Sequence, residues 1–177
     1  MELSEALARR RACRDFSDEP VPRELVEKLT YAARRAPTAC NAPYRHVMVI
    51  DDPKVIGGVK LMSPSLLANP PVLLVIITDL IEAVEKTGPL AERSSYVDSG
   101  AAGENILLAA TELGLGSQFT MIPAMAGIRE ILGLPLHYRV DLIIPIGYPR
   151  ISAKTVKARK GANKVFHNQF GVFFGEA

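Results

Sequence analysis

The feature that most constrains this chain is the uninterrupted apolar run VLLVII at residues 72–77, which Thr78 extends. The run is rich in β-branched residues and is far shorter than the roughly 20 apolar residues that cross a bilayer as a helix. A strand without alternation between apolar and polar positions is buried on both faces. The run therefore predicts the central strand of a sheet that is covered on both sides.

Two further strands and several helices follow from the same kind of pattern. Residues 45–50 end in an Asp-Asp-Pro turn and predict a strand, and residues 140–146 predict a second buried strand. Helices are expected in a short segment with Leu3, Ala6 and Leu7 at helical spacing, and over residues 23–35, 54–61 and 127–132. This mixture of helices and strands predicts a globular α and β domain.

The segment DSGAAGENILLAATEL, residues 98–113, has the strongest helical pattern. Asp98 is expected to cap its N terminus, and Gly114 is expected to end it. Small residues at 100–103 allow another helix to approach closely, so we expect this helix at the centre of the domain or at a subunit interface. The polar stretch before it, residues 82–95, is expected to be either a loop or partly helical, and to be the most mobile part of the chain.

Composition excludes several classes of protein. The chain has 177 residues, of which 48% are hydrophobic, which is enough for one domain with a substantial core. Its 21 basic and 19 acidic residues give a net charge of +2, which favours neither nucleic acid nor a membrane as partner. Cys13 and Cys40 are too few for a disulfide framework, and the N-terminal MELSEALARRR is no signal peptide. We therefore expect a cytoplasmic protein with two inert thiols.

The common catalytic and metal-binding motifs are missing from the sequence. Gly114-Leu115-Gly116 begins like a dinucleotide fingerprint, but Phe119 takes the place of the third glycine and the segment follows a helix. The 3 histidines lack the paired spacing of zinc ligands. Neither a G-x-S-x-G elbow nor a Walker lysine is present. We therefore predict no metal site and no catalytic side chain of these classes.

Basic residues gather near both ends of the chain. Guanidinium groups match phosphate oxygens and neutralise their charge, so two such clusters can close on one phosphate. The alternative, which composition alone favours, is a solvated basic surface. The clusters are Arg9, Arg10, Arg11 and Arg14 near the N terminus, and Lys154, Lys157, Arg159 and Lys160 near the C terminus.

The last segment, residues 151–177, is first basic and then aromatic. Its phenylalanines need an apolar surface to pack on, which is either the chain's own core or a neighbouring subunit. We expect these phenylalanines to pack on a partner subunit instead of forming a gate over a substrate site. The residues are Phe166, Phe170, Phe173 and Phe174.

Residues 10–50 resemble the N-terminal signature of the FMN-dependent nitroreductase family. Members share an Arg-Arg-Ser-x-Arg-x-Phe opening, a Pro-Val-Pro bridge, a helix that ends in Ala-Ala, and an Ala-Pro-Ser-x-x-Asn segment. The corresponding residues here are Arg10, Arg11, Ala12, Arg14 and Phe16, then residues 20–22, then Ala36, Pro37, Thr38 and Asn41. The segments DSGAAGENILLAATELGLGS, ILGLP, PIGYP and KARKG also match in the right order, so the resemblance covers most of the chain.

The resemblance implies an α+β, three-layer α/β/α fold with a mixed, mainly antiparallel central sheet. It implies a single domain over residues 1–177 and an intertwined homodimer, in which residues 150–177 form a C-terminal arm that packs on the partner subunit. It also implies FMN sites at the subunit interface, with NAD(P)H as co-substrate.

The same resemblance assigns roles to particular residues. Arg10, with Lys157 or Arg159, would hold the FMN phosphate, and Arg11 and Ala12 belong to the same motif. Arg14 would lie near N1 and the C2 carbonyl of the flavin, where positive charge favours hydride uptake. The partner subunit would contribute Pro37, Thr38, Ala39 and Asn41.

The chain departs from the family pattern in both of these segments. Ala12 replaces the usual serine, and Ala39 lacks a hydroxyl that some members carry; each lost hydrogen bond is worth about 1 kcal/mol. Ala42-Pro43-Tyr44 stands where the family usually reads x-Gln-Pro-Trp, so this segment is one residue shorter and lacks the glutamine. These changes bear on flavin affinity and on the substrate pocket more than on the fold.

The resemblance implies a flavoenzyme with a ping-pong cycle. NAD(P)H delivers hydride to flavin N5 and leaves, and an electron-poor acceptor such as a nitroaromatic, a quinone or an enone takes its place. One alternative is a non-enzymatic flavin-binding carrier or sensor on the same scaffold. Another is a protein that binds the phosphate backbone of nucleic acid through the arginine clusters.

Overall fold

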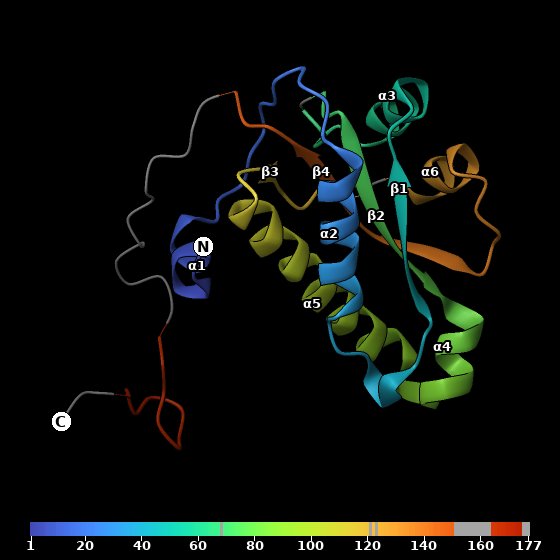
Figure 1. Ribbon diagram of the computed structural model, residues 1–177. Helices are drawn as coiled ribbons and strands as arrows, with labels where there is room; N and C mark the ends of the chain where they lie inside the picture. The colour runs from blue at the N-terminus through green and yellow to red at the C-terminus, as the bar shows by residue number, and fades with distance from the viewer. Residues whose placement is uncertain (68, 121, 123, 151–163, 175–177) are drawn as a thin grey trace.

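The computed structural model describes residues 1–67, 69–120, 122, 124–150 and 164–174 (Figure 1). Its centre is a four-stranded sheet with the strand order β1-β2-β4-β3. Each pair of neighbouring strands is antiparallel, and a parallel bridge joins Ala12 to Ser117. The four-stranded sheet is thus antiparallel, as mainly expected, and its one parallel contact among the described residues is the isolated bridge at Ala12. The strands are β1 (Arg45–Ile50), β2 (Val72–Asp79), β3 (Gly116–Ser117) and β4 (Tyr138–Gly147).

Strand β2 is the central strand that the apolar run predicts. All but the last of its 8 residues are buried. In the middle of the strand, Val75 lies opposite Met48 of β1 and Ile143 of β4. The lack of alternation in the sequence is explained by helices that cover both faces of the sheet.

The helices form the outer two layers (Figure 1). Helices α2 and α5 pack against the face of the sheet that carries Leu74 and Ile76. Helices α3 and α6 pack against the opposite face, which carries Leu73 and Val75. The α+β, three-layer prediction is therefore confirmed. The α-helices are α1 (Leu3–Arg9), α2 (Arg23–Arg34), α3 (Pro53–Met62), α4 (Leu80–Thr87), α5 (Ala91–Glu112) and α6 (Met125–Ile131), with short 3-10 turns η1 (Ala39–Asn41) and η2 (Gly88–Leu90).

Residues 82–95, expected to be loop or partly helical, are helical throughout, in α4, η2 and the first turns of α5, so the loop alternative is wrong. The predicted mobility of this stretch stays a prediction. The buried positions Ala91, Ser95, Asp98 and Ala102 recur at helical spacing. Small and polar residues occupy these positions, so the apolar stripe that usually reveals a helix is missing from the sequence.

The expected cap at Asp98 is also wrong. Helix α5 begins at Ala91, so Asp98 lies well inside the helix, where it is only 7% exposed. The other end agrees with expectation, since Gly114 follows the helix with a positive φ of 74°.

The small residues of α5 meet side chains of the same chain. A Cβ atom on Gly103 would lie 2.7 Å from both Phe119 and Leu142, whereas one on Gly100 would meet no atom within 4 Å. None of the helices in the described residues is long and apolar enough to cross a membrane.

Candidate functional site

The N-terminal segment that contains the predicted flavin-binding arginines is held on the edge of the sheet by its backbone. Ala12 forms a bridge with Ser117 of β3, and the Cys13 N–H donates to the Ser117 carbonyl at 3.0 Å. Phe16, which is 3% exposed, is buried beside Pro149 and anchors the segment. Because backbone and Phe16 contacts fix the segment, its arginine side chains are left to face solvent or a ligand.

Two arginine side chains of this segment, Arg10 and Arg14, make few contacts with the rest of the described chain. Arg10 Nε lies 3.6 Å from Glu104 Oε1, with both side chains more than a third exposed, and such a pair contributes little to stability. Arg14 is exposed and makes no ion pair within the part of the chain that the structure describes. Arg9 pairs with Glu5 one turn earlier on α1, as a solvated helix residue does. Lys157 and Arg159 lie outside the described residues.

A small basic pocket of about 110 Å³ lies beside this segment, and we call it the arginine pocket. A Cβ atom on Gly116 would lie 2.5 Å from Cys13 Sγ, so only glycine lets the N-terminal segment approach here. Burial raises the pKa of the Cys13 thiol, which keeps it protonated and unreactive. The pocket is lined by Arg9, Arg11, Cys13, Thr111, Gly114, Leu115, Gly116 and Pro149.

A larger cavity of about 400 Å³ lies along the chain just after β3. Its walls are mainly apolar, with Phe119, Ile122 and Leu142 among them. Thr120 Oγ1 is buried there and has no hydrogen-bond partner among the described residues. An unpartnered buried hydroxyl in an apolar cavity is suited to a ligand with a polar edge.

The second predicted segment, Pro37, Thr38, Ala39 and Asn41, forms a tight turn after α2. Cys40 and Asn41 both have positive φ values, 55° and 52°, which residues with a Cβ rarely adopt. Thr38 and Ala39 are half-buried, while the other residues of the turn are exposed. A strained and exposed turn is typical of a binding segment that the surrounding structure holds in place.

A group of buried polar contacts holds this turn; we call it the Asp98 cluster. The Asp98 carboxylate accepts hydrogen bonds from the Ala39 N–H at 2.8 Å and from the Tyr44 hydroxyl. Burial and the neighbouring Asp98 charge raise the pKa of Tyr44 to about 12. The Arg45 guanidinium donates to four backbone carbonyls, those of Ala33, Ala36, Pro37 and Asp98, at 2.8 to 3.2 Å.

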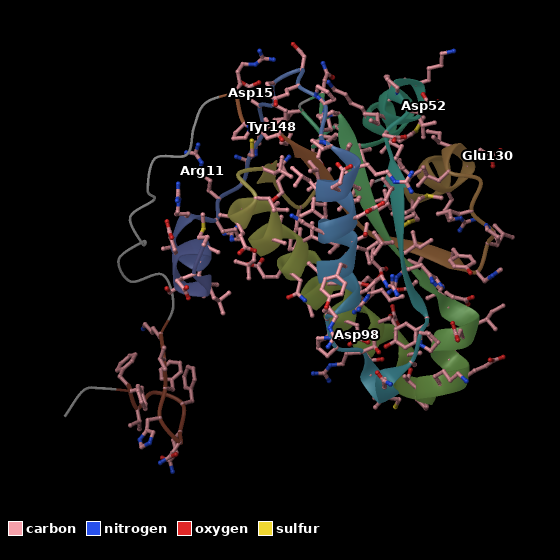
Figure 2. The ribbon with its side chains drawn as sticks, in the orientation of Figure 1. Arg11, Asp15, Asp52, Asp98, Glu130 and Tyr148 are labelled. Carbon is pink, nitrogen blue, oxygen red and sulfur yellow. The ribbon has the colours of Figure 1, made fainter. Side chains whose placement is uncertain are left out.

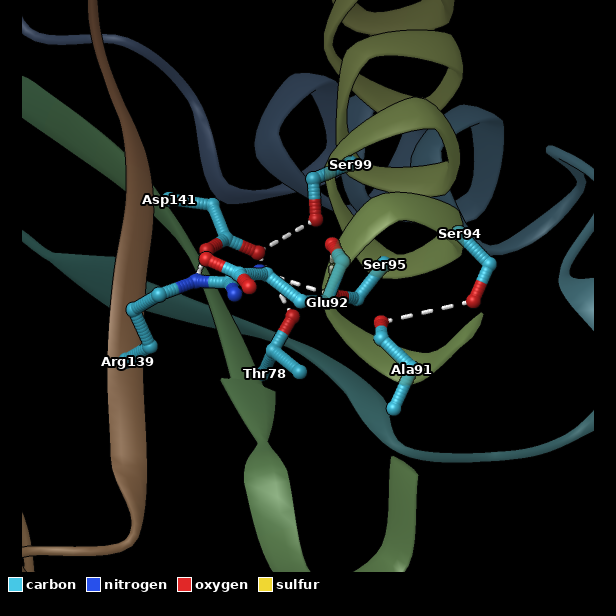
Figure 3. Close-up of polar contacts among 8 residues, drawn as sticks. All are labelled: Thr78, Ala91, Glu92, Ser94, Ser95, Ser99, Arg139 and Asp141. Atoms are coloured by element: carbon cyan, nitrogen blue, oxygen red, sulfur yellow. Dashed lines mark hydrogen bonds and ion pairs between the residues drawn. The ribbon is translucent and has the colours of Figure 1, made fainter. Parts of the chain in front are cut away.

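A second buried group, the Asp141 cluster, lies on the sheet side of α5 (Figure 3). Asp141 is 1% exposed and accepts from Thr78 Oγ1 and Ser99 Oγ, both at 2.6 Å, and from Arg139 Nε. Arg139 also donates to Ser95 and lies over the Tyr96 ring. Every polar group of Asp141 is paired, so this cluster fastens α5 to β2 and β4.

Sequence reasoning missed both clusters. A charged residue inside the buried run 140–146 was an available signal for Asp141, because an unpaired charge is not tolerated there. Asp98 carried no such signal, since its position after a polar stretch is equally typical of a cap.

The structure places Arg11 in the arginine pocket, Arg10 beside Glu104 and Arg14 at the surface, and it joins none of them to the turn residues. The turn is fixed at Asp98, whereas the N-terminal segment contacts Glu104 and Ser117. At a rise of 1.5 Å per residue, Asp98 lies about 9 Å along α5 from Glu104, which Arg10 contacts, and about 20 Å from Thr111, which lines the arginine pocket. Figure 2 shows Arg11 and Asp98 near different ends of α5.

The fold and the arginine pocket define an α+β protein with a basic, glycine-lined recess at the edge of its sheet. The chain belongs to the nitroreductase family, whose model matches residues 7–62 and 58–148.

Known proteins with similar sequences and structures agree. The chain is 30% identical over 155 residues to a protein of Methanothermobacter thermautotrophicus provisionally named NADH dehydrogenase/NAD(P)H nitroreductase, with 84% of this chain and 78% of the relative covered. A protein of the same name from Archaeoglobus fulgidus is 32% identical over 154 residues, with 80% and 82% covered. The structure of an FMN-dependent nitroreductase from Clostridium difficile superimposes with a TM-score of 0.80 at 30% identity, covering 93% of this chain and 98% of the other.

Proposed function

We propose that this protein is an FMN-dependent oxidoreductase that carries reducing equivalents from NAD(P)H to an electron-poor small molecule in a ping-pong cycle. The observation that carries the proposal is the arginine pocket beside Gly116 in a chain of the nitroreductase family. The names of the relatives support NAD(P)H as reductant, and that of the Clostridium structure supports FMN.

The residues present fit FMN. Arg10, Arg11 and Arg14 supply charged donors for a phosphate dianion, with Lys157 and Arg159 as further proposed donors. The apolar cavity after β3 suits a flat ring system, and the unpartnered Thr120 hydroxyl suits its polar edge. Ala12 adds only backbone groups, since it has no hydroxyl to offer. When bound, FMN supplies the hydride-transfer chemistry, and the protein's part is to bind, orient and exclude water.

We also propose that the complete site forms only in a homodimer. One chain keeps the arginine segment and the Pro37–Asn41 turn apart along α5, so a second copy would have to contribute the turn. Tyr96 and Val97, which are 51% and 67% exposed on α5, offer apolar surface for that contact. This arrangement makes Pro37, Thr38, Ala39 and Asn41 residues of the partner's site.

The C-terminal arm, residues 150–177, is proposed to pack on the partner subunit. Residues 164–174 stand apart from the body of the domain in Figure 1. Phe166 contacts Phe170 and Phe173 at ring distances of 4.8 and 5.3 Å, yet Phe170 remains 92% exposed. An aromatic cluster of this kind has unmet apolar surface that a second chain can bury. The whole chain would then act as a single domain, residues 1–177.

A cytoplasmic location is part of the proposal, and the free thiols Cys13 and Cys40 agree with a reducing compartment. The partners we expect are a second copy of the chain and a small electron acceptor, without nucleic acid or membrane.

Absorption spectroscopy of purified protein tests the function. We expect bound FMN whose absorbance NAD(P)H bleaches without oxygen and a nitroaromatic then restores, with parallel double-reciprocal plots. Protein that takes up no FMN and oxidises no NAD(P)H would overturn the proposal. FMN that binds but is reduced by neither nicotinamide would identify a carrier or sensor instead.

A further inference from the structure

We propose that Asp98, together with Tyr44 and Arg45, is a positioning residue that sets the Pro37–Asn41 turn in its ligand-binding conformation. The inference rests on the proposed function, in which this turn belongs to the flavin site of the partner subunit. It concerns residues that hold the turn through hydrogen bonds, of which Arg45 also lines a groove together with Thr38 and Asn41.

The turn needs an external support. Its own backbone bonds are Asn41 N–H to Thr38 C=O at 3.0 Å and Ala42 N–H to Ala39 C=O at 3.1 Å. These two hydrogen bonds are opposed by backbone strain, because the consecutive residues Cys40 and Asn41 carry a Cβ and have left-handed conformations. Because left-handed backbone is disfavoured for such residues, the isolated sequence would populate other conformations.

Asp98 supplies the cap that the turn itself lacks. Thr38 occupies the N-cap position of η1, yet its side chain makes no capping hydrogen bond. The Asp98 carboxylate takes that role from 59 residues away by accepting the Ala39 N–H. The Thr38 hydroxyl is thereby kept for other partners, and it makes no hydrogen bond to any described residue.

The other two members of the cluster fix both flanks of the turn. The Arg45 guanidinium donates to the carbonyls of Ala36 and Pro37, where the chain leaves α2, and to the Asp98 carbonyl on α5. Tyr44 is fully buried and donates its hydroxyl to the same carboxylate oxygen that holds Ala39. The turn is therefore tied to α2 and α5 by buried side chains, while its own surface stays exposed.

The experiment compares Asp98→Ala and Asp98→Asn with the control Ser99→Ala. Ser99 is the next residue of α5, but it points to Asp141 on the sheet side, so its loss weakens the helix anchor without touching the turn. Tyr44→Phe removes one donor from Asp98 and keeps the ring, and it serves with Asp98→Asn if Asp98→Ala does not fold.

The first readout is the rate at which an aromatic disulfide reagent labels Cys40 in FMN-free protein that also carries Cys13→Ala. Cys40 lies in the turn and is exposed, so its labelling rate reports the order of the turn. The second readout is the dissociation constant for FMN, from fluorescence quenching, with the native Cys13. The melting temperature of every variant is measured beside both readouts.

We expect Asp98→Ala to change the Cys40 labelling rate and to weaken FMN binding, each by about tenfold. Asp98→Asn should show a smaller change, because its amide oxygen still accepts the Ala39 N–H. Ser99→Ala should lower the melting temperature while changing neither readout.

A wild-type labelling rate in Asp98→Ala would overturn the inference. An altered labelling rate with unchanged FMN affinity would also overturn it, since the turn would then have no part in the site. Failure of the wild-type protein to bind FMN would instead contradict the proposed function, and the labelling rates would still decide whether Asp98 positions the turn.

Discussion

The two segments of the candidate site are held in opposite ways. The Arg10–Arg14 segment is fixed by backbone pairing with Ser117 and by buried Phe16, and its charged side chains face outward. The Pro37–Asn41 turn is fixed by charged side chains from elsewhere, and its backbone adopts a disfavoured conformation. The first segment should therefore tolerate side-chain changes without loss of structure. The second should depend on side chains from outside the turn.

The largest effect is expected from complementation between two defective chains. Arg10→Ala/Arg14→Ala removes the proposed donors from one segment, and Asn41→Val places a β-branched residue at a left-handed position of the turn. The two variants are combined in a heterodimer, which is isolated with two different affinity tags. If the turn acts across the interface, one of its two sites has the intact arginines of one chain and the intact turn of the other. The heterodimer should regain about half of the wild-type activity at limiting FMN, where each parent homodimer is inactive. No recovery in the heterodimer would mean that both segments serve a site within one chain.

The arginine substitutions alone should weaken FMN binding strongly and leave stability unchanged. Two charge-assisted hydrogen bonds, at about 1.5 kcal/mol or more each, correspond to roughly 100-fold in the dissociation constant. Calorimetry or fluorescence titration measures the affinity, and Arg93→Ala, at an exposed position on α5, is the matched control. A large drop in melting temperature would show that the arginines hold the segment, contrary to the comparison.

The turn should make the stability of the protein depend on pH through Tyr44. The folded-state pKa of Tyr44 is raised to about 12 from an ordinary value of 10, so the folded state keeps this proton longer than the unfolded state. The contribution is fully present below pH 10 and is lost as the pH rises to 12, up to about 2 to 3 kcal/mol. Urea unfolding across this range should show the loss in the wild type and a reduced loss in Tyr44→Phe. If the free energy of unfolding depended on pH in the same way in both proteins, Tyr44 would not be the cause of the loss.

The smallest effect is expected from glycine substitutions in the two segments. Cys40→Gly relieves the left-handed strain and should raise the free energy of unfolding by up to about 1 kcal/mol. Arg14 has no positive φ, so Arg14→Gly should leave stability unchanged or lower it. Chemical denaturation of both variants measures the difference. Equal changes at the two positions would argue against strain in the turn.

Local patterns explain which elements were predicted well. The run at 72–77 has no polar position, so a strand buried on both faces was its only consistent interpretation, and β2 confirms it. The start of α5 was predicted too late, at Asp98 instead of Ala91, because Ser95 and Asp98 occupy buried helix positions where apolar residues are usual. Their partners, Arg139 and Ala39, lie 44 and 59 residues away, so no local pattern identifies them.

The sequence by itself determined the strand at the centre of the sheet, the helical segments that cover it, and membership of the nitroreductase family through spaced motifs. Those features depend on the identity and spacing of neighbouring residues. Only the tertiary structure decided that Asp98 supports a turn instead of capping a helix, and that the arginine pocket at Thr111 lies about 20 Å along α5 from Asp98. The physical reason is that a buried charge must find its hydrogen-bond partners in space, and those partners come from distant parts of the chain.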